Sequence, residues 1–372
     1  MKIKYFVING GGGSATAAIN RCNFFTEGHS KNGVKSYVKL IGPRKCDSNL
    51  FRRLFVGIDY FITISFALLF SRRGDVLIFY GHFPFLRIWK YLRHRKYLLI
   101  AERNEYPSHI LFKNDKIRAQ KRSRSENYLQ NLNMFDGLIT CTHSLEKFYT
   151  PFLNSKASSI VRPSIVNTSQ FECTGLITKK KYITYCGDWG NLKDGVPILI
   201  KAFSLVSEKF NDFKLRLIGG TSNSEDEKFI LTLIEELNLS RKVVLEGKVK
   251  HALVPKLLNE SMILVLARPS NKQAEGGFPS KVTEYMATGV PTLVTRVGEI
   301  EKYFQDNIHL SISEPDTHIG FAEKLVEIIE NYSDALIVAE AGKLKNKDFD
   351  YVNQSQALID FLNSIKTNFQ RQ

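Results

Sequence analysis

Cysteine is scarce in this chain, and no two of its five cysteines lie at Cys-x-x-Cys spacing: Cys22, Cys46, Cys141, Cys173 and Cys186. A structural zinc site or a disulfide framework needs clustered or evenly paired cysteines. The odd count and the wide spacing therefore argue against both. They favour a protein of the reducing cytoplasm.

Long apolar runs are also missing. The N-terminus, MKIKYFVINGGGG, has no extended apolar region followed by a small-residue cleavage site, so it is interpreted as a first strand and not as a signal peptide. The strongest membrane candidate, residues 54–70, is shorter than the roughly 20 apolar residues of a spanning helix and contains Asp59. We expect a buried helix of the first domain. Because Arg52-Arg53 and Arg72-Arg73 flank it, a helix lying partly in the bilayer surface is the alternative.

Acidic residues are depleted in one part of the chain. Against 52 Lys and Arg the sequence has 37 Asp and Glu, which gives a net charge of +15. Residues 87–124 alone hold twelve Lys and Arg but only three acids, and aromatic residues such as Trp89 and Tyr91 lie among them. Such a stretch favours anionic partners. No nucleic-acid-binding motif accompanies it, so an anionic membrane surface is expected and nucleic acid is not.

The order of apolar runs predicts the fold. A chain of 372 residues is long enough for two domains. Short apolar runs alternate with amphipathic stretches, which is typical of a doubly wound parallel sheet. The first half predicts strands at 3–8, 36–41, 76–80, 97–101 and 137–140 and helices at 15–26 and 144–149. The second half predicts strands at 183–186, 214–218, 243–246, 263–267 and 292–295 and helices at 195–209, 225–237, 254–259 and 281–288.

We therefore expect an α/β protein of two Rossmann-like domains that face each other across a cleft. The boundaries follow from composition: a first Rossmann-like domain at 1–166, a polar linker at 167–181, a second Rossmann-like domain at 182–345 and a C-terminal helical segment at 346–372. Open α/β sheets bind ligands at the carboxyl ends of their strands, so the loops there are the candidate site.

The segment 274–294, AEGGFPSKVTEYMATGVPTLV, carries the most chemical information. A loop with Glu275, Gly276, Gly277 and Phe278 leads into a predicted helix with Ser280 as its N-cap. A glycine-bearing loop at a helix N-terminus presents free backbone N–H groups and the positive end of the helix dipole, which suits phosphate. Glu284 lies one turn further on, where its carboxylate can accept hydrogen bonds from sugar hydroxyls. The alternative is a helix after a turn with both carboxylates solvated.

This segment resembles the Glu-x7-Glu motif of retaining glycosyltransferases of the GT-B fold, family 4. Residues 284–291, EYMATGVP, match the second part of that motif, and Phe278 falls on its phenylalanine. Glu275 lies nine residues before Glu284 and not eight, which is a departure from the pattern. The resemblance implies a nucleotide-sugar site in the second half of the chain.

A second segment falls in the order expected of the same family. Residues 185–195, YCGDWGNLKDG, resemble its strand–Gly–Arg–x4–Lys–Gly opening, with Gly187 on the glycine and Lys193 on the phosphate-binding lysine. Asp188 stands at the position of the arginine, a second departure. Lys281, at the start of the motif helix, is the candidate for a compensating cation.

In the first half, Gly10–Gly13 follow the first strand and satisfy a dinucleotide fingerprint, but no acid follows the second strand to hold a ribose. The resemblance assigns Gly11, Gly12 and Gly13 to the donor diphosphate, with a flexible turn as the alternative. His82 follows a strand and is a candidate for substrate contact. The segment ERNEYP, residues 102–107, follows another strand and is expected either to bind acceptor or to brace its loop.

The resemblance implies transfer of a sugar from a nucleotide diphosphate sugar such as a UDP-sugar to a glycan or lipid-linked acceptor, in bacterial surface polysaccharide synthesis and with retention of configuration. Catalysis is assigned to Lys193, Lys281, Glu275 and His82, without a metal ion and with no cofactor besides the donor. The expected location is the cytoplasm or the inner face of the cell membrane. Three alternatives stay open: a non-catalytic partner subunit of a polysaccharide synthase, a sugar-nucleotide epimerase of similar fold, and a nicotinamide dehydrogenase.

Overall fold

The computed structural model describes residues 1–8, 13–42, 49–81, 83, 97–111, 126, 128–172, 177–190, 193–221 and 223–370. The chain forms two compact units. The first unit contains Met1–Ile165 and Tyr351–Gln372, and the second contains Val166–Asp350. Each unit is built on its own parallel sheet with helices on its faces, so the predicted fold class, α/β with two Rossmann-like domains, is confirmed.

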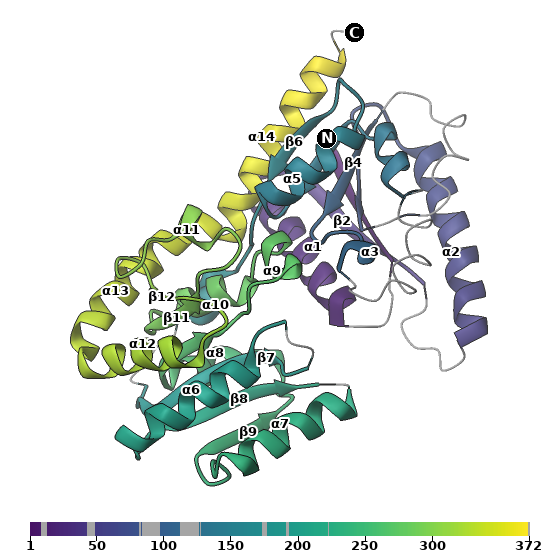
Figure 1. Ribbon diagram of the computed structural model, residues 1–372. Coiled ribbons are helices and arrows are strands. Elements are labelled where there is room, and N and C mark those ends of the chain that lie inside the picture. Colours follow the sequence, from purple (N-terminus) through teal and green to yellow (C-terminus); the bar gives the residue numbers. More distant parts are fainter. Residues whose placement is uncertain are drawn as a thin grey trace. The chain divides into compact units, whose positions relative to one another are not determined.

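The sheet of the first unit has six parallel strands in the order β2-β1-β3-β4-β5-β6 (Figure 1). The chain begins in its middle, so the connections after β1 run to both sides and create a switch point between β1 and β3. The strands are β1 (Lys2–Ile8), β2 (Lys35–Ile41), β3 (Val76–Tyr80), β4 (Leu98–Arg103), β5 (Gly137–Thr140) and β6 (Ser158–Val161).

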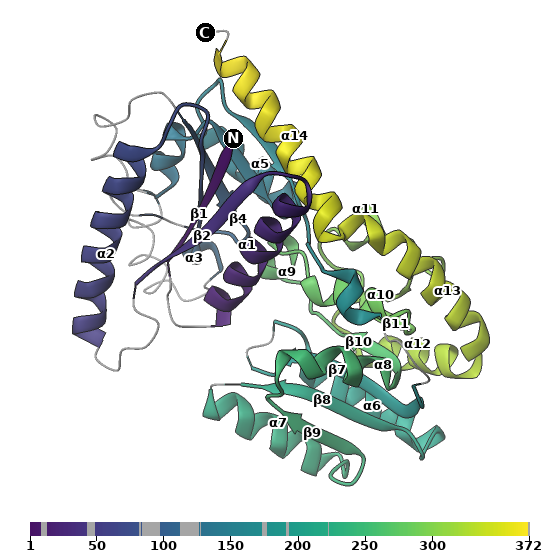
Figure 2. The same ribbon diagram turned by 180° about the vertical axis from the view of Figure 1, so that it is seen from behind.

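The described helices of the first unit are α1 (Gly13–Lys31), α2 (Asn49–Phe70), α3 (Ser108–Leu111), α5 (His143–Tyr149) and α14 (Tyr351–Gln370). The last helix of the chain, α14, packs beside the first, α1 (Figure 2). Its buried Leu358, Leu362 and Ile365 recur at a helical spacing and join the core cluster of β1, β3 and β4. The C-terminal helix thus belongs to the fold of the N-terminal sheet.

The sheet of the second unit is also six-stranded and parallel, in the order β12-β11-β10-β7-β8-β9. Its switch point lies between β7, the first strand of the unit, and β10. The strands are β7 (Lys180–Asp188), β8 (Lys214–Gly220), β9 (Val243–Gly247), β10 (Ser261–Leu266), β11 (Thr292–Thr295) and β12 (Ser311–Ser313).

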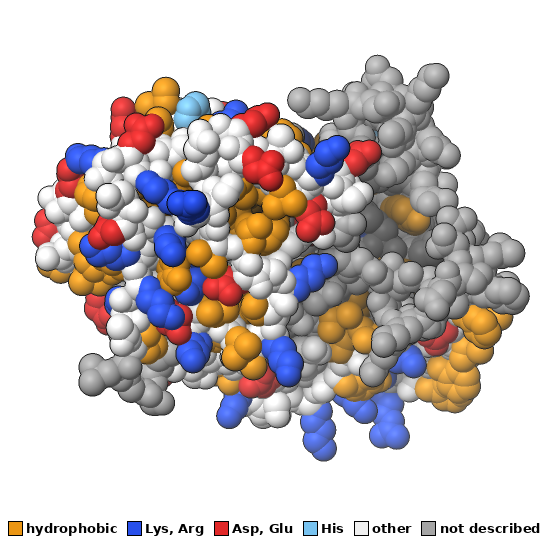
Figure 3. All heavy atoms as spheres, turned by 90° about the horizontal axis from the view of Figure 1, so that it is seen from below, with side chains coloured by type: hydrophobic (Ala, Val, Ile, Leu, Met, Phe, Trp, Pro, Cys, Tyr) orange, Lys and Arg blue, Asp and Glu red, His pale blue; other side chains and the backbone are white. Residues whose placement is uncertain are grey.

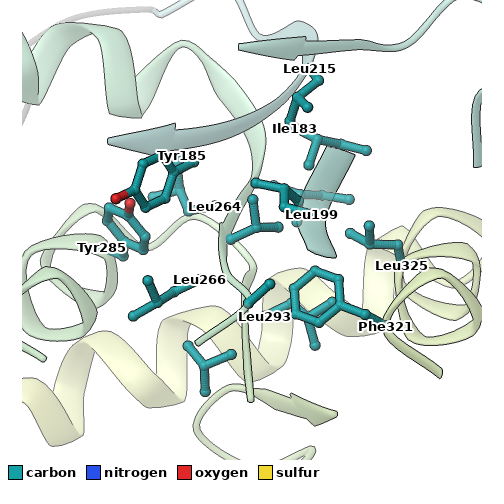
Figure 4. Close-up of a cluster of buried hydrophobic side chains, with 14 of the residues drawn as sticks. Ile183, Tyr185, Leu199, Leu215, Leu264, Leu266, Tyr285, Leu293, Phe321 and Leu325 are labelled. Carbon is teal, nitrogen blue, oxygen red and sulfur yellow. The ribbon is translucent and has the colours of Figure 1, made fainter. Parts of the chain in front are cut away.

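The described helices of the second unit are α6 (Val196–Lys209), α7 (Ser224–Glu236), α8 (Val254–Asn259), α9 (Lys272–Gly276), α10 (Ser280–Thr288), α11 (Ile300–Tyr303), α12 (His318–Glu330) and α13 (Tyr332–Lys345). Consecutive buried residues in β7, β8 and β10 place both faces of the sheet in a core, as parallel sheets require. Figure 4 shows part of this core, with Leu199 and Phe321 approaching the strands from different helices.

Every strand predicted from the sequence is present, and the C-terminal helical segment expected over 346–372 contains α14. The sequence analysis did not identify β6, β12 or the helices α11, α12 and α13. The residues expected to form a linker, 167–181, fall in the second unit, where the turn η4 (Thr168–Phe171) buries Phe171 in the core. Residues 346–350 also fall in the second unit, whereas α14 falls in the first.

The prediction of a buried helix over 54–70 is half wrong. The helix α2 exists, but only one of its faces is buried, with Tyr60, Ile64 and Leu68 against the first unit. The buried face packs on β2 and on Phe83, and the other face is exposed. None of the helices in the described residues, α2 included, has the length and apolarity needed to cross a bilayer.

The contact between α1 and α14 depends on a glycine. A Cβ atom on Gly28 would lie 2.1 Å from Ser355 Oγ and 2.3 Å from the carbonyl oxygen of Tyr351. Gly28→Ala should therefore force the helices apart and destabilise the first unit by about 1–3 kcal/mol, measured as the free energy of unfolding in urea.

Gly57 on α2 is the matched control, because nothing lies within 4 Å of a Cβ built there. Gly57→Ala should be neutral or stabilise by up to about 1 kcal/mol, since alanine has the higher helix propensity. Equal stability of the two variants would contradict the tight packing of α1 on α14.

Candidate functional site

The polar groups of the second unit converge at the switch point between β7 and β10. The loop after β7 and the segment after β10 touch here, because a Cβ on Gly195 would lie 1.7 Å from the carbonyl oxygen of Ala267. Gly195 has a φ of +68° and begins α6. The close approach and the left-handed backbone together require glycine. Because these two segments touch, Asp194 of the first and Arg268 of the second come close together.

Asp194 is the centre of the site. Its side chain is 4 % exposed, and its Oδ2 atom lies 2.8 Å from Lys281 Nζ and 2.9 Å from the Tyr185 hydroxyl. Its Oδ1 atom lies 3.4 Å from Nε of the buried Arg268. One carboxylate from the β7–α6 loop therefore holds a cation from the segment after β10 and a cation from α10.

The electrostatics of the cluster favour the ionised acid. Burial alone would raise the pKa of Asp194, but the charges of Lys281 and Arg268 and the hydrogen bonds from Lys281 and Tyr185 outweigh it, and the pKa falls below its usual range. The carboxylate is charged throughout the physiological range. It carries one negative charge against two positive charges, so the cluster as a whole is suited to a further anion.

Lys281 lies directly over the end of β7. A Cβ on Gly187 would lie 2.2 Å from Lys281 Cε, so a side chain at this position would displace the end of the lysine side chain. The Lys281 side chain is a quarter exposed. The neighbouring thiol of Cys186 has its pKa raised to about 12 by burial and by the charge of Glu284, and Cys186 is therefore neutral. Gly187, which was expected to bind the donor, lies against the end of the Lys281 side chain.

Glu284 occupies the next turn of α10. Burial raises the pKa of its carboxyl group, while the charges of Lys281 and His251 lower it. The adjacent Tyr285 lies beside Tyr185 in Figure 4, and its hydroxyl accepts a hydrogen bond of 2.8 Å from the Cys186 N–H. Tyr285 thereby fixes α10 to the end of β7, which keeps Glu284 and Lys281 on the same side of the sheet edge.

Arg268 also fixes the loop before α10, because its Nη1 donates a hydrogen bond of 3.2 Å to the carbonyl oxygen of Gly277. Gly276 ends α9 and is buried. Phe278 does not face this cluster: its ring stacks on Phe349 at a centroid distance of 5.8 Å.

The prediction that Ser280 is the N-cap is wrong. Pro279 holds the cap position, and Ser280 is the first helical residue. Proline has no N–H group to satisfy and is tolerated at the start of a helix. The exposed Ser280 side chain thus makes no cap hydrogen bond, whereas the helix end at Gly289, with φ of +71°, is as predicted.

Three predicted residues lie around the cluster. Glu275 is on α9, where both of its carboxylate oxygens lie 2.8 Å from Lys272 Nζ. Asp188 is exposed, and its Oδ1 accepts the N–H of Gly190 at 2.7 Å, which closes a tight turn after β7. Lys193, next to Asp194, is half-buried.

The remaining candidates belong to the first unit. His82, Gly11 and Gly12 lie outside the described residues, as does most of the basic stretch 87–124, and Gly13 is the first residue of α1. The ERNEYP segment is described. Glu102 is buried in an ion pair of 2.6 Å with Arg21, and the carbonyl oxygen of Glu105 accepts the Tyr149 hydroxyl. These contacts fit the bracing role: Arg21 engages Oε1 of Glu102, while the buried Oε2 makes no hydrogen bond within the described residues.

Sequence reasoning missed Asp194 and Arg268. A signal existed for Arg268, because a charged residue directly after the apolar run of β10 marks the carboxyl end of a central parallel strand. Asp194 carried no such signal, since an acid beside a lysine in a loop is ordinarily solvated. Within the residues that the structure describes, no cluster of His, Cys, Asp or Glu side chains could hold a metal ion.

A family comparison matches the part of the chain that carries this site. Residues 167–345 match the family described as Glycosyl transferases group 1. The second unit is therefore similar to a glycosyltransferase domain. The match covers the cluster of Asp194, Arg268 and Lys281, and it also covers Glu284. No curated protein sequence matches this chain.

Solved structures share the fold of the whole chain. Sucrose-phosphate synthase from Thermosynechococcus elongatus has a TM-score of 0.76 at 14% identity and covers 99% of this chain and 100% of its own. HepE from Anabaena, solved with UDP-glucose, has a TM-score of 0.70 at 14% identity over 98% and 100%. A glycosyltransferase from Rickettsia africae has a TM-score of 0.71 at 13% identity over 98% of each chain. At such identities the likeness establishes the two-domain fold.

The Asp194 cluster predicts a pH-dependent stability. Asp194→Asn would leave the buried Arg268 without its counter-charge, and breaking a buried ion pair costs about 3–5 kcal/mol. The folded-state pKa of Asp194 lies below the unfolded value of about 3.9. Its contribution is therefore fully present above the unfolded pKa and is lost as pH falls through the folded pKa.

Urea unfolding of the wild type and of Asp194→Asn should show a large difference at neutral pH that shrinks below about pH 4. Asp212→Asn is the control, because Asp212 makes an exposed ion pair with Lys181 and its loss should leave stability unchanged. The charged cluster is contradicted if the free energy of unfolding of the wild type exceeds that of Asp194→Asn by the same amount from neutral to low pH.

Proposed function

We propose that this chain transfers a sugar from a UDP-sugar to a glycan or lipid-linked acceptor in bacterial surface polysaccharide synthesis, with retention of configuration. The match of residues 167–345 to the group 1 glycosyltransferases supports the reaction class. The fold shared with HepE, which was solved with UDP-glucose, supports a UDP-sugar as donor. The donor is a co-substrate, and the proposal includes neither a further cofactor nor a metal ion.

The observation that carries the proposal is the Lys281–Asp194–Arg268 cluster at the switch point. Cleavage of a sugar–diphosphate bond leaves negative charge on the departing diphosphate, so catalysis needs positive charge fixed at that position. Lys281 would supply this positive charge. Because Asp194 pairs with Lys281 and its side chain lies against Gly187, the lysine needs little reorganisation as the negative charge develops. The first turn of α10 adds its free N–H groups and the positive end of its dipole.

Glu284 would bind hydroxyl groups of the donor. A carboxylate accepts at both oxygens, which matches a pair of neighbouring hydroxyls on a ribose or a hexose. Its attachment to α10 keeps it one turn from Lys281, so a single helix would contact the diphosphate with its first turn and a sugar ring with its second. Burial strengthens such hydrogen bonds because water competes less.

The remaining assignments are proposals on the same basis. Lys193 would add a second cation for the diphosphate, and Gly11, Gly12, Gly13, Gly276, Gly277, Phe278 and Ser280 would line the donor site. Glu275 and His82 are proposed to be catalytic residues, with His82 in contact with the substrate. For Glu275 this requires exchange of its Lys272 partner for substrate, which an exposed i, i+3 ion pair of small free energy permits.

A lipid-linked acceptor would bring the protein to the inner face of the cell membrane. The net charge of +15 and the basic stretch 87–124 support attraction to anionic lipids. We therefore propose a cytoplasmic protein that associates peripherally with this membrane. Nucleic acid is not a proposed partner.

A non-catalytic partner subunit of a polysaccharide synthase is the second candidate. Two observations favour it: Asp188 replaces a cation expected beside the donor phosphates, and Glu275 is paired with Lys272. Transfer by the purified chain alone, with any nucleotide sugar and a glycan acceptor, would exclude this candidate. Conversion of the donor sugar without any acceptor would instead indicate an epimerase.

Glu284→Gln should weaken donor binding while the fold stays intact. Loss of a charge-assisted hydrogen bond removes about 1.5–3 kcal/mol, which corresponds to a rise in the Kd for UDP-sugar of roughly 10- to 150-fold in calorimetry. Glu235→Gln, an exposed change on α7, is the control and should bind like the wild type. Unchanged affinity in Glu284→Gln would remove Glu284 from the donor site.

Lys281→Met should cut turnover by about 10²–10³, because one preorganised charge-stabilising group is lost while the apolar stem remains. Lys193→Met should act in the same direction. Asp188→Asn should be nearly silent, since an amide oxygen can still accept the Gly190 N–H.

Lys228→Met on the exposed surface of α7 controls for loss of a lysine as such. Thermal melting of each variant shows whether it is folded. Full activity in a folded Lys281→Met would show that this lysine does not stabilise the leaving group.

A further inference from the structure

The outer face of α2 is an exposed apolar surface on the first unit. Its members are large side chains that are between 49% and 69% exposed: Phe55, Ile58, Phe61, Ile62, Phe66, Leu69 and Phe70. They recur at spacings of three and four residues and so follow one side of the helix. In Figures 1 and 2 the helix runs along the periphery of the first unit. Figure 3 shows orange side chains gathered on the side where Figure 1 draws α2.

This surface is unfavourable in water. Complete burial of a Phe, Leu or Ile side chain stabilises by about 1.5–3 kcal/mol, and seven such side chains are roughly half exposed here. Large contiguous apolar patches on soluble proteins mark interaction sites. The opposite face of the helix already packs on the first unit through Tyr60, Ile64 and Leu68, so the outer face is additional to what the core requires.

The charges on α2 and next to it indicate which partner covers its outer face. Its one acidic residue, Asp59, is engaged within the protein, since its carboxylate accepts the Gly42 N–H at 2.6 Å and the Thr63 hydroxyl at 3.0 Å. Exposed Arg72 and Arg73 follow the last turn, and Arg52-Arg53 lie in the first turns by sequence. An apolar helix face followed by two exposed arginines complements a layer of acyl chains beneath anionic headgroups.

A second copy of the chain fits this surface poorly. Two α2 helices packed face to face would each add the exposed Arg72 and Arg73 to the interface. Each chain also carries a net charge of +15. The acidic groups that would offset this repulsion are missing from the face itself.

We propose that α2 lies in the plane of an anionic bilayer with its outer face inserted at the level of the headgroups and upper acyl chains. At about 1.5 Å per residue the helix presents a strip roughly 30 Å long. This inference rests on the membrane partner in the proposed function and names the element that makes the contact. It does not depend on the chemistry at Lys281.

The test uses vesicles of equal parts phosphatidylcholine and phosphatidylglycerol, and vesicles of phosphatidylcholine alone. The full chain should co-sediment with the anionic vesicles. The triple change Phe55→Gln, Ile62→Gln and Phe66→Gln, which keeps helix-forming residues, should lower the partition coefficient by about 100-fold. Arg72→Gln with Arg73→Gln should lower it on anionic vesicles only. The matched control is Phe229→Gln, Ile337→Gln and Leu344→Gln, three exposed apolar residues of the second unit, which should bind like the wild type.

Insertion is separated from surface attraction by fluorescence. In Phe66→Trp, lipids brominated on their acyl chains should quench the added emission, and high salt should reduce the quenching only in part. Binding that high salt abolishes, with no quenching, would overturn the insertion. Equal binding of the α2 triple variant and the wild type would overturn it as well. So would a wild-type dimer in sedimentation velocity that the triple variant abolishes, because a second copy would then cover the face.

The donor affinity of the α2 triple variant, measured by calorimetry in the absence of vesicles, should equal that of the wild type. This measurement keeps the two proposals apart. Loss of vesicle binding with intact donor binding supports the membrane contact of α2, whereas a wild-type chain that binds vesicles but no nucleotide sugar refutes only the proposed chemistry.

Discussion

The buried carboxylate of Asp194 is the interaction on which the second unit depends. It is the shared partner of Lys281, Arg268 and Tyr185, and so joins the loop after β7, the segment after β10 and the helix α10. Through Arg268 it also fixes the loop at Gly277. A single charge thus determines both the packing at the switch point and the position of the cation that we assign to catalysis.

Close contacts at three glycines make the arrangement around Asp194 possible. A Cβ atom on Gly195 would meet the carbonyl group of Ala267, and a Cβ atom on Gly219 would meet the carbonyl group of Gly187. A Cβ atom on Gly187 would meet the side chain of Lys281. Side chains at these positions would separate the strand ends and spread the cations. The site is therefore compact because three strand-end positions lack a side chain, and it lies where parallel α/β sheets place their ligands.

Much of the fold could be predicted from the sequence because parallel strands are buried on both faces and appear as short apolar runs. The runs that were missed, β6 and β12, are short and contain several serines, so their composition resembles that of loops. The exposed side of α2 could not be predicted, since its apolar residues look like those of a helix buried all round.

The site was predictable where residue type and order coincided, as for Lys281 and Glu284 on one helix after a glycine loop. The role of Asp194 was not, because its partners Lys281 and Arg268 lie more than seventy positions away in the sequence and only the folded sheet brings them together. The N-cap prediction at Ser280 failed for a local reason, since Pro279 takes the cap position and leaves the serine inside the helix.

A crystal structure of the chain with bound UDP is the most direct measurement of the central claim. We expect the diphosphate within hydrogen-bonding distance of Lys281 Nζ and of the first-turn N–H groups of α10, with a ribose hydroxyl on Glu284. The Asp194–Arg268 contact should persist. A nucleotide bound away from the switch point of the second unit, with Lys281 contacting only Asp194, would contradict the assignment of this cluster to the donor.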